Sequence, residues 1–167
     1  MADIEVREAR REDAAGLAEL LNAIIARGGT TALEDPYTAD RFAWAYIDGP
    51  DVHCCFVAVD TRTGRPEGYQ SLGRSRDLPA AIGDVGTFAR LGGAQRGVGS
   101  ALFAATRARA AQLGLAAINA TIRADNAGGL AFYAKQGFQD HSITPDVPLK
   151  DGTPVDRVNK RFALKSA

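Results

Sequence analysis

Apolar residues recur along this chain at spacings that predict both helices and strands, and hence a mixed α/β fold. Ile4 and Val6 alternate with charged residues, as expected of a half-buried first strand. A helix should follow and end at Gly28-Gly29. Its buried face is expected to consist of Leu17, Leu20, Leu21 and Ile24. A shorter helix is predicted after Thr38, burying Phe42, Ala45 and Tyr46.

The middle of the chain predicts strands over residues 53–60, 67–74 and 82–90. A helix over residues 99–113 comes next, with Gly114 at its end. Its buried stripe is expected to be Val98, Ala101, Leu102, Ala105 and Ala108. After a strand over residues 116–122, a second helix should begin at its cap Asn126 and end at Gly137. A turn at Asp151-Gly152 is predicted between two closing strands.

The glycine-rich turn over residues 91–99 leads directly into the helix at 99–113, and such a turn is a candidate anion site. Backbone N–H groups of a turn and of the first helical turn lack internal partners and point at one spot, which the helix dipole makes favourable for negative charge. A Walker loop is excluded because Val98 and Gly99 stand where Lys and Ser or Thr are needed. A dinucleotide fingerprint is disfavoured because Leu102 replaces the small third residue.

Composition narrows the class of protein. The chain has 167 residues, 46% of them hydrophobic, with 20 Lys plus Arg balanced by 20 Asp plus Glu, which predicts one soluble domain over residues 1–167. Zero net charge disfavours a nucleic-acid or membrane partner, and the absence of an apolar signal segment suggests a cytoplasmic location. The adjacent Cys54 and Cys55 should face opposite ways on a strand without forming a disulfide. With only His53 and His141 besides, no metal site is expected.

Two motifs of the chain together resemble the GNAT superfamily of acetyl-CoA-dependent N-acyltransferases. The first is Gly97-Val98-Gly99-Ser100-Ala101-Leu102, and the second is Asn126 followed by Phe132-Tyr133-Ala134-Lys135-Gln136-Gly137-Phe138. The resemblance implies an α/β fold with a central, mostly antiparallel mixed sheet, splayed at the acetyl-CoA site and flanked by helices. It also implies acetyl-CoA as co-substrate.

The resemblance further implies which residues hold the cofactor. The amides of the glycine-rich loop would hold the CoA pyrophosphate; the first slot of the family's loop motif falls on Ala94, one place before Gln95. The preceding strand would pair with the pantetheine arm and offer a backbone N–H near Ala89 to the thioester oxygen. Asn126 would bond the pantetheine, cap its helix, or do both. The full expected set is Phe88, Ala89, Arg90, Leu91, Gln95, Arg96, Gly97, Val98, Gly99, Ser100 and Asn126.

Acetyl transfer from a thioester to an amine needs a base for the amine and a proton for the departing thiolate. The resemblance places Tyr133 beside the CoA sulfur, where its phenol can supply that proton; the alternative is that Tyr133 only packs beside Leu130. Asp84 is the best carboxylate for the base, because phosphinothricin acetyltransferases carry a Glu at the equivalent place. The alternative is that Asp84 only orders the end of its strand.

The acceptor is predicted to be a small amino-acid-like amine. The run from Gly28 to Thr38 resembles the phosphinothricin acetyltransferase subgroup in a loop that borders the acceptor pocket. The candidate acceptor residues are Thr31, Glu34, Tyr37, Arg74 and Arg76. The arginines suit a carboxylate or phosphinate, and solvation at the surface is the alternative for them. A peptide or protein amine, or a non-catalytic acyl-CoA sensor, are the other hypotheses, and a homodimer is left open.

Overall fold

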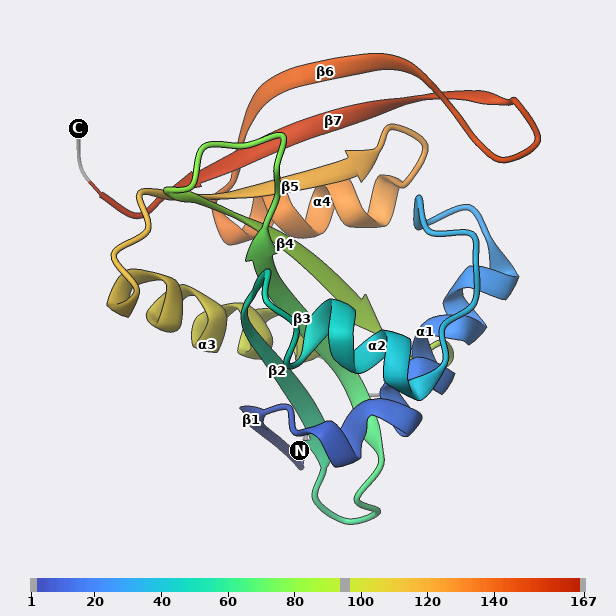
Figure 1. Cartoon of the computed structure of the whole chain (residues 1–167), viewed down its shortest axis with the longest axis vertical. Helices are drawn as coiled ribbons and strands as arrows, with labels where there is room; N and C mark the ends of the chain where they lie inside the picture. The colour runs from blue at the N-terminus through green and yellow to red at the C-terminus, as the bar shows by residue number, and fades with distance from the viewer. Residues whose placement is uncertain (1–2, 94–96, 166–167) are drawn as a thin grey trace.

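A computed structural model describes residues 3–93 and 97–165, and a sheet with helices on both faces runs through it (Figure 1). The sheet has seven strands in the order β1-β2-β3-β4-β5-β7-β6. They are β1 Ile4–Glu8, β2 Val52–Asp60, β3 Pro66–Arg74, β4 Ile82–Ala89, β5 Ala117–Arg123, β6 Gln139–Pro148 and β7 Pro154–Ala163. Neighbouring strands pair antiparallel except β4 and β5, which are parallel. The predicted fold class is confirmed.

Two helices cover each face of the sheet. After the short 3-10 turn η1 (Arg11–Asp13), α1 (Ala14–Arg27) and α2 (Ala39–Tyr46) pack on β2 and β3. On the other face, α3 (Val98–Gln112) packs on β1–β4 and α4 (Ala127–Gln136) on β5 (Figure 1). Thr38 caps the predicted shorter helix by accepting the Arg41 N–H over 3.1 Å. Gly137 ends α4 as predicted, at a φ of 102° that a side chain would strain.

The sheet separates two hydrophobic cores. Three predicted core positions are wrong: Ala45, Ala101 and Ala108 are exposed. In α3 the bulky Phe103 turns the helix so that Thr106 and Ala110 are buried instead. In α2 the buried pair is Phe42 and Ala43, and Ala45 faces a cavity. Alanine carries so little apolar surface that it does not decide the orientation of a helix.

Cys54 and Cys55 lie on opposite faces of β2, as predicted. Both are buried and free: Cys54 belongs to the core under α3, and Cys55 belongs to the core under α1 and α2. Burial raises the pKa of the Cys54 thiol to about 11. The two thiols are thus protonated members of two separate cores.

The sheet opens between β4 and β5. Their parallel pairing runs from Ile82 opposite Ala117 to Val85 opposite Ala120 and goes no further, although both strands continue. Beyond Val85, β4 keeps its pairing with β3 on the other side, up to Gly68 opposite Ala89. The last part of β4 therefore presents a sheet edge to the interior of the molecule rather than to its rim.

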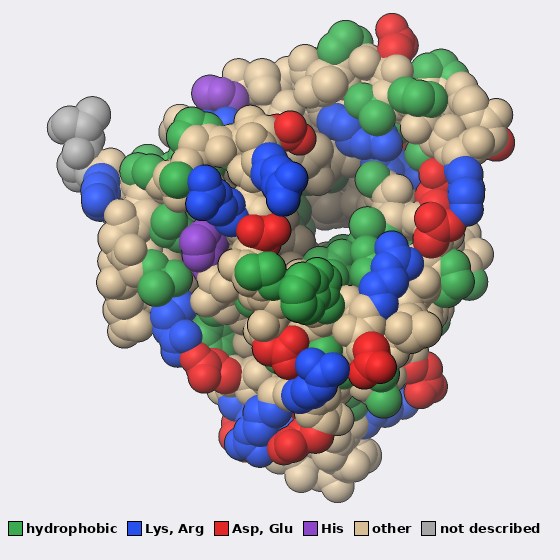
Figure 2. Space-filling model, viewed as in Figure 1, with side chains coloured by type: hydrophobic (Ala, Val, Ile, Leu, Met, Phe, Trp, Pro, Cys, Tyr) green, Lys and Arg blue, Asp and Glu red, His purple; other side chains and the backbone are tan. Residues whose placement is uncertain are grey.

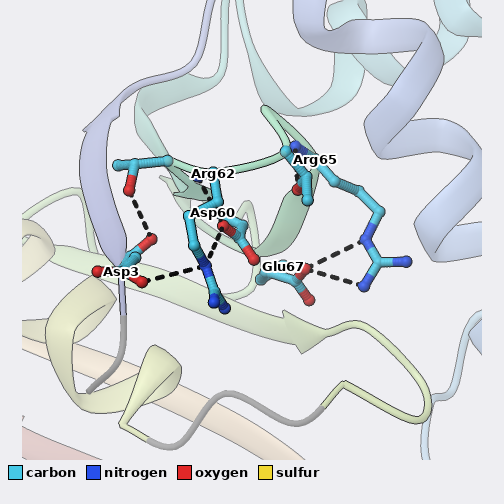
Figure 3. Close-up of polar contacts among 7 residues, drawn as sticks. Asp3, Asp60, Arg62, Arg65 and Glu67 are labelled. Atoms are coloured by element: carbon cyan, nitrogen blue, oxygen red, sulfur yellow. Dashed lines mark hydrogen bonds and ion pairs between the residues drawn. The ribbon is translucent and has the colours of Figure 1, made fainter.

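A cluster of charged side chains lies at the turn between β2 and β3 (Figure 3), and the backbone of the same segment holds Arg90 at the end of β4. Arg65 donates through Nε and Nη2 to the buried Glu67 carboxylate, over 3.1 and 3.0 Å. The Glu67 and Pro66 carbonyls accept the backbone N–H and the guanidinium Nε of Arg90, over 2.8 and 2.7 Å. Arg90, the residue that follows β4, is therefore fixed at the start of the glycine-rich turn.

None of the helices in the described ranges has the length and apolar character needed to span a membrane.

Candidate active site

A cavity of about 760 Å³ lies where β4 and β5 separate. The space-filling view shows the corresponding face hollowed between the β6–β7 hairpin and α2 (Figure 2). Its walls combine the end of β4, the end of β5, the starts of α3 and α4, and the loop between α1 and α2. Asp84 and Tyr133 both line it. One cavity thus brings together the two residues predicted to be the base and the acid.

Strand alternation assigns the exposed backbone groups of β4 to particular residues. The Arg90 N–H bonds the Glu67 carbonyl of β3, so alternate residues back along β4 also point their backbone groups toward β3. The N–H and C=O of Thr87 and Ala89 consequently face the open side. These groups are able to pair with an extended ligand, such as an amide-bearing arm, and Ala89 is the residue near which a backbone contact is predicted.

The start of α3 offers a group of backbone donors to the same cavity. Gly97 caps the helix at a φ of 78°, and the Ala101 N–H is bonded to the Gly97 carbonyl. The amides of Val98, Gly99 and Ser100 precede this bond, so the start of α3 has the unbonded N–H groups that an anion site would need. Gln95 and Arg96, predicted to contact the cofactor, lie outside the described residues.

Gly99 has a packing role that the sequence did not reveal. A Cβ on Gly99 would come within 2.5 Å of Cε1 of Phe132, so only glycine lets the start of α3 approach α4 at this point. Gly99 also lines the cavity. The contact between the two helices and the anion site thus depend on the same residue.

The remaining cofactor candidates fall into two groups. Phe88, Ala89, Leu91 and Asn126 line the cavity, whereas Arg90 is held against the β2–β3 turn. Asn126 accepts the Gly129 N–H through Oδ1 over 2.9 Å and donates through Nδ2 to the Thr30 carbonyl over 3.0 Å. Asn126 is thus the helix cap predicted for it, and it also ties the loop between α1 and α2 to α4.

Tyr133 is held by aromatic packing and by one hydroxyl contact. Its ring lies edge-on to Phe132 and Phe138, each with a centroid separation of 5.0 Å. Its Oη lies 2.8 Å from Oγ1 of Thr87 on β4. Burial raises the pKa of Tyr133 to about 12, so the phenol is protonated at neutral pH and is able to donate.

Asp84 lies on the opposite face of β4 from Thr87, because it differs from Thr87 by an odd number of positions. Asn119, its partner on β5, donates from Nδ2 to Asp84 Oδ1 over 2.9 Å. Arg161 of β7 donates from Nε to Asn119 Oδ1 over 2.7 Å. Burial raises the pKa of Asp84, while the Asn119 hydrogen bond and the Arg161 charge act in the other direction. The result is a half-buried carboxylate with increased basicity.

The predicted acceptor residues do not all meet at the cavity. Thr31 and Arg74 line it, and Arg76 does not. Glu34 and Tyr37 border a smaller neighbouring pocket. The Glu34 carboxylate accepts the Lys150 backbone N–H over 2.8 Å, and the Tyr37 hydroxyl lies 3.2 Å from that of Tyr46. Of the two predicted arginines, Arg74 is therefore the one at the cavity.

Asn119 and Arg161, with the side chains of Thr87 and Gln70, were missed by the sequence reasoning. One signal was available on β5, where Asn119, Thr121 and Arg123 alternate with buried apolar residues. That pattern marks a polar stripe on a strand whose other face is core. Among the described residues, no group of three or more His, Cys, Asp or Glu side chains is arranged to hold a metal ion.

Comparison with known protein families assigns the class. The model of the acetyltransferase (GNAT) family matches residues 17–138, and the chain therefore belongs to this family. The matched segment extends from α1 to the end of α4 and includes both motifs on which the predicted resemblance rested. No protein with a curated description matches the sequence significantly.

Solved structures show the same fold at low sequence identity. The chain is similar to the Salmonella typhimurium protein YncA, described as a candidate acetyltransferase with its cofactor acetyl-CoA, at 21% identity and a TM-score of 0.83, covering 99% of this chain and 96% of that one. It is also similar to a phosphinothricin acetyltransferase from Sinorhizobium meliloti in complex with acetyl-CoA, at 20% identity, a TM-score of 0.80 and coverages of 96% and 88%. A third similar structure is a ribosomal-protein-alanine N-acetyltransferase from Brucella melitensis, at 21% identity and a TM-score of 0.81, covering 95% of this chain and 99% of that one.

Proposed function

We propose that residues 1–167 act as one domain that transfers the acetyl group of acetyl-CoA to the primary amine of a small amino-acid-like acceptor by direct attack. The observation that carries this proposal is the cavity at the β4–β5 opening, lined by Asp84 and Tyr133 together. Asp84 projects from one face of β4, and Tyr133 of α4 contacts Thr87 on the other face, so a base and an acid flank the gap between the strands. The presence of both residues favours an enzyme over an acyl-CoA sensor.

The residues around the opening fit acetyl-CoA. The amides of Val98, Gly99 and Ser100 suit the pyrophosphate, and the free edge of β4 at Thr87 and Ala89 suits the amides of the pantetheine arm. Acetyl-CoA supplies the thioester. In this proposal Asp84 takes the amine proton, directly or through water, and Tyr133 provides the proton that the leaving sulfur needs.

A small acceptor is favoured over a protein segment because the loop between α1 and α2 is tied across the cavity. Arg123 donates to the Thr31 carbonyl over 3.1 Å, and Asn126 donates to the Thr30 carbonyl. On the outside, Lys150 in the β6–β7 turn pairs with Asp35. Contacts with both β5–α4 and the β6–β7 turn leave the loop little freedom to admit a long chain. Arg74 then suits a carboxylate on the acceptor.

The cofactor part of the proposal is tested by Ser100→Asp, read by calorimetric titration with acetyl-CoA. Ser100 is exposed, and an acidic side chain in the first turn favours the helix, so the protein should fold with unchanged or slightly higher thermal stability. The same charge beside the pyrophosphate should weaken binding at least tenfold, since like charges in contact cost on the order of several kcal/mol. Gly99 is unsuitable for this test because any side chain there strikes Phe132.

Ser100→Asn is the matched control, because it has nearly the same shape without the charge. It should bind acetyl-CoA within about threefold of the unmodified protein, a change below about 1 kcal/mol. If Ser100→Asp and Ser100→Asn bind equally well, the pyrophosphate does not lie at the start of α3 and the assignment of this site fails.

A further inference from the structure

The Tyr133 hydroxyl is the end of a chain of polar groups that crosses from β3 to α4. Gln70 on β3 donates from Nε2 to Thr87 Oγ1 over 2.9 Å, and Thr87 Oγ1 lies 2.8 Å from Tyr133 Oη. Gln70 is 0% exposed and Tyr133 is 7% exposed. Gln70 and Thr87 are directly opposite each other in the register of β3 and β4. Two strands thus fix the oxygen that contacts the phenol.

The contact between Thr87 and Tyr133 can be made with either hydroxyl as the donor. The Gln70 Nε2 is a donor only, so it occupies one lone pair of the Thr87 oxygen. Whichever hydroxyl donates, the proton of the other is free to point into the cavity, which both residues line. When Thr87 is the donor, its hydrogen bond favours the phenolate and lowers the Tyr133 pKa against the effect of burial. In that arrangement the Tyr133 proton points away from Thr87.

We propose that Gln70 and Thr87 are positioning residues that turn the Tyr133 proton toward the departing sulfur and stabilise the phenolate once that proton has left. This inference rests on the proposed function, because it presupposes that Tyr133 is the acid. Gln70 holds Thr87 in its donating orientation, and Thr87 then acts on Tyr133. The Tyr133 ring cannot turn away because Phe132 and Phe138 pack against it.

The proton balance of the step is complete without a further reactant. As the amine nitrogen bonds to the acetyl carbon, the carbon–sulfur bond breaks and its electron pair goes to sulfur. The Tyr133 O–H bond breaks and its proton is transferred to sulfur. The phenolate that remains accepts a hydrogen bond from the Thr87 hydroxyl. Asp84 holds the proton lost by the amine. Water carries one proton from Asp84 to Tyr133 before the next turnover.

A double-mutant cycle with Thr87→Val, Tyr133→Phe and the combined variant tests the inference. Thr87→Val keeps the shape of the residue and deletes the hydroxyl. We expect it to lower kcat about tenfold with little change in KM for acetyl-CoA, as for loss of a hydrogen bond to a group that becomes charged. In the Tyr133→Phe background the same substitution should have almost no effect, because Thr87 acts through the phenol.

Thr87→Ser is the matched control, since it restores the hydroxyl and should recover most of kcat; a Gln70→Met variant should show a smaller loss than Thr87→Val. Circular dichroism and thermal melting establish that each variant folds. The inference is overturned if Thr87→Val lowers kcat by the same factor in the unmodified protein and in the Tyr133→Phe background, or if Thr87→Ser is as slow as Thr87→Val. In either case the acid role of Tyr133 stands. If Tyr133→Phe alone has full kcat, the acid assignment itself fails.

Discussion

The two faces of β4 hold their reactive groups in different ways. On the face toward α3 and α4, Tyr133 is bound into a short chain that ends in the core at Gln70. On the face toward α1 and α2, Asp84 is bonded to Asn119, and the polar contacts continue outward to Arg161 of β7. One chain of polar groups is closed and the other runs across the sheet to a partly exposed arginine.

This difference matches what each group has to do. Burial raises both pKa values, but a phenol with a higher pKa remains a proton donor, whereas a carboxylate with a higher pKa becomes a stronger base. Packing between aromatic rings suits a group that must begin each turnover protonated, because it keeps the phenol neutral. Polar contacts that continue to a partly exposed arginine suit a group that must exist as a carboxylate when the amine attacks. Alternation along one strand keeps the two environments apart.

The largest effect is expected for Asp84→Asn, which removes the base and leaves an oxygen that can still accept the Asn119 hydrogen bond. We expect kcat/KM to fall roughly 10³-fold, within the usual range for general base catalysis. The intact enzyme should lose activity as the pH falls through the raised pKa of Asp84, and Asp84→Asn should lack this acidic limb. Initial rates of thiol release, measured across pH for both proteins, test this role of Asp84.

The same variant should be more thermally stable. Because the folded-state pKa of Asp84 is raised, the carboxyl stabilises the fold below its ordinary pKa, and that contribution is lost as the pH rises through the folded value. At neutral pH, Asp84→Asn therefore removes a desolvated charge. Asp77→Asn is the control: it deletes an exposed carboxylate outside the cavity that raises the Asp84 pKa, so it should only shift the acidic limb to slightly lower pH. An acidic limb that survives in Asp84→Asn would exclude Asp84 as the base.

Tyr133→Phe should have the next largest effect, about a 10²-fold loss of kcat, because it deletes the proton donor and keeps the aromatic packing. KM for acetyl-CoA should change little. Steady-state rates combined with a test of solvent viscosity show whether chemistry limits turnover. An unchanged kcat under limiting chemistry would mean that Tyr133 only packs, and the contrast between the two faces of β4 would then be structural.

The smallest effect is expected for Arg74→Ala. Loss of a charge-assisted pair should raise KM for amino acids about tenfold and leave simple alkylamines nearly unaffected. Arg76→Ala should give a smaller change, because this side chain does not line the cavity. A panel of amine acceptors assayed by thiol release measures both. Equal effects of Arg74→Ala on amino acids and alkylamines would contradict a carboxylate-binding role.

Local signals in the sequence predicted the order of the helices and strands correctly. Thr38, Asn126 and Gly137 act through their own backbone neighbourhood, so their caps could be inferred without knowledge of the fold. The orientation of the alanine-rich α3 could not, because it depends on how Phe103 fits against residues far away in the sequence. The mistaken core positions Ala101 and Ala108 follow from that.

The residues of the candidate site likewise fall into those that local sequence predicts and those that depend on the folded sheet. Tyr133 and the start of α3 lie in motifs that are read locally, and the cavity brings Asp84 to them. The pairing of Asn119 with Arg161 became visible only in the sheet, because β5 and β7 are distant in sequence and adjacent in space. The side-chain contact of Thr87 with Tyr133 depends on how α4 packs against the opened sheet.

The two adjacent cysteines of β2 give each core its own chemical reporter. Cys54 is reached only when the packing under α3 loosens, and Cys55 only when the packing under α1 and α2 does. Burial raises the pKa of both thiols, so neither reacts readily in the closed protein. Alkylation followed by mass spectrometry of this dipeptide would therefore time the opening of the two layers separately, in one unlabelled molecule and without an engineered probe.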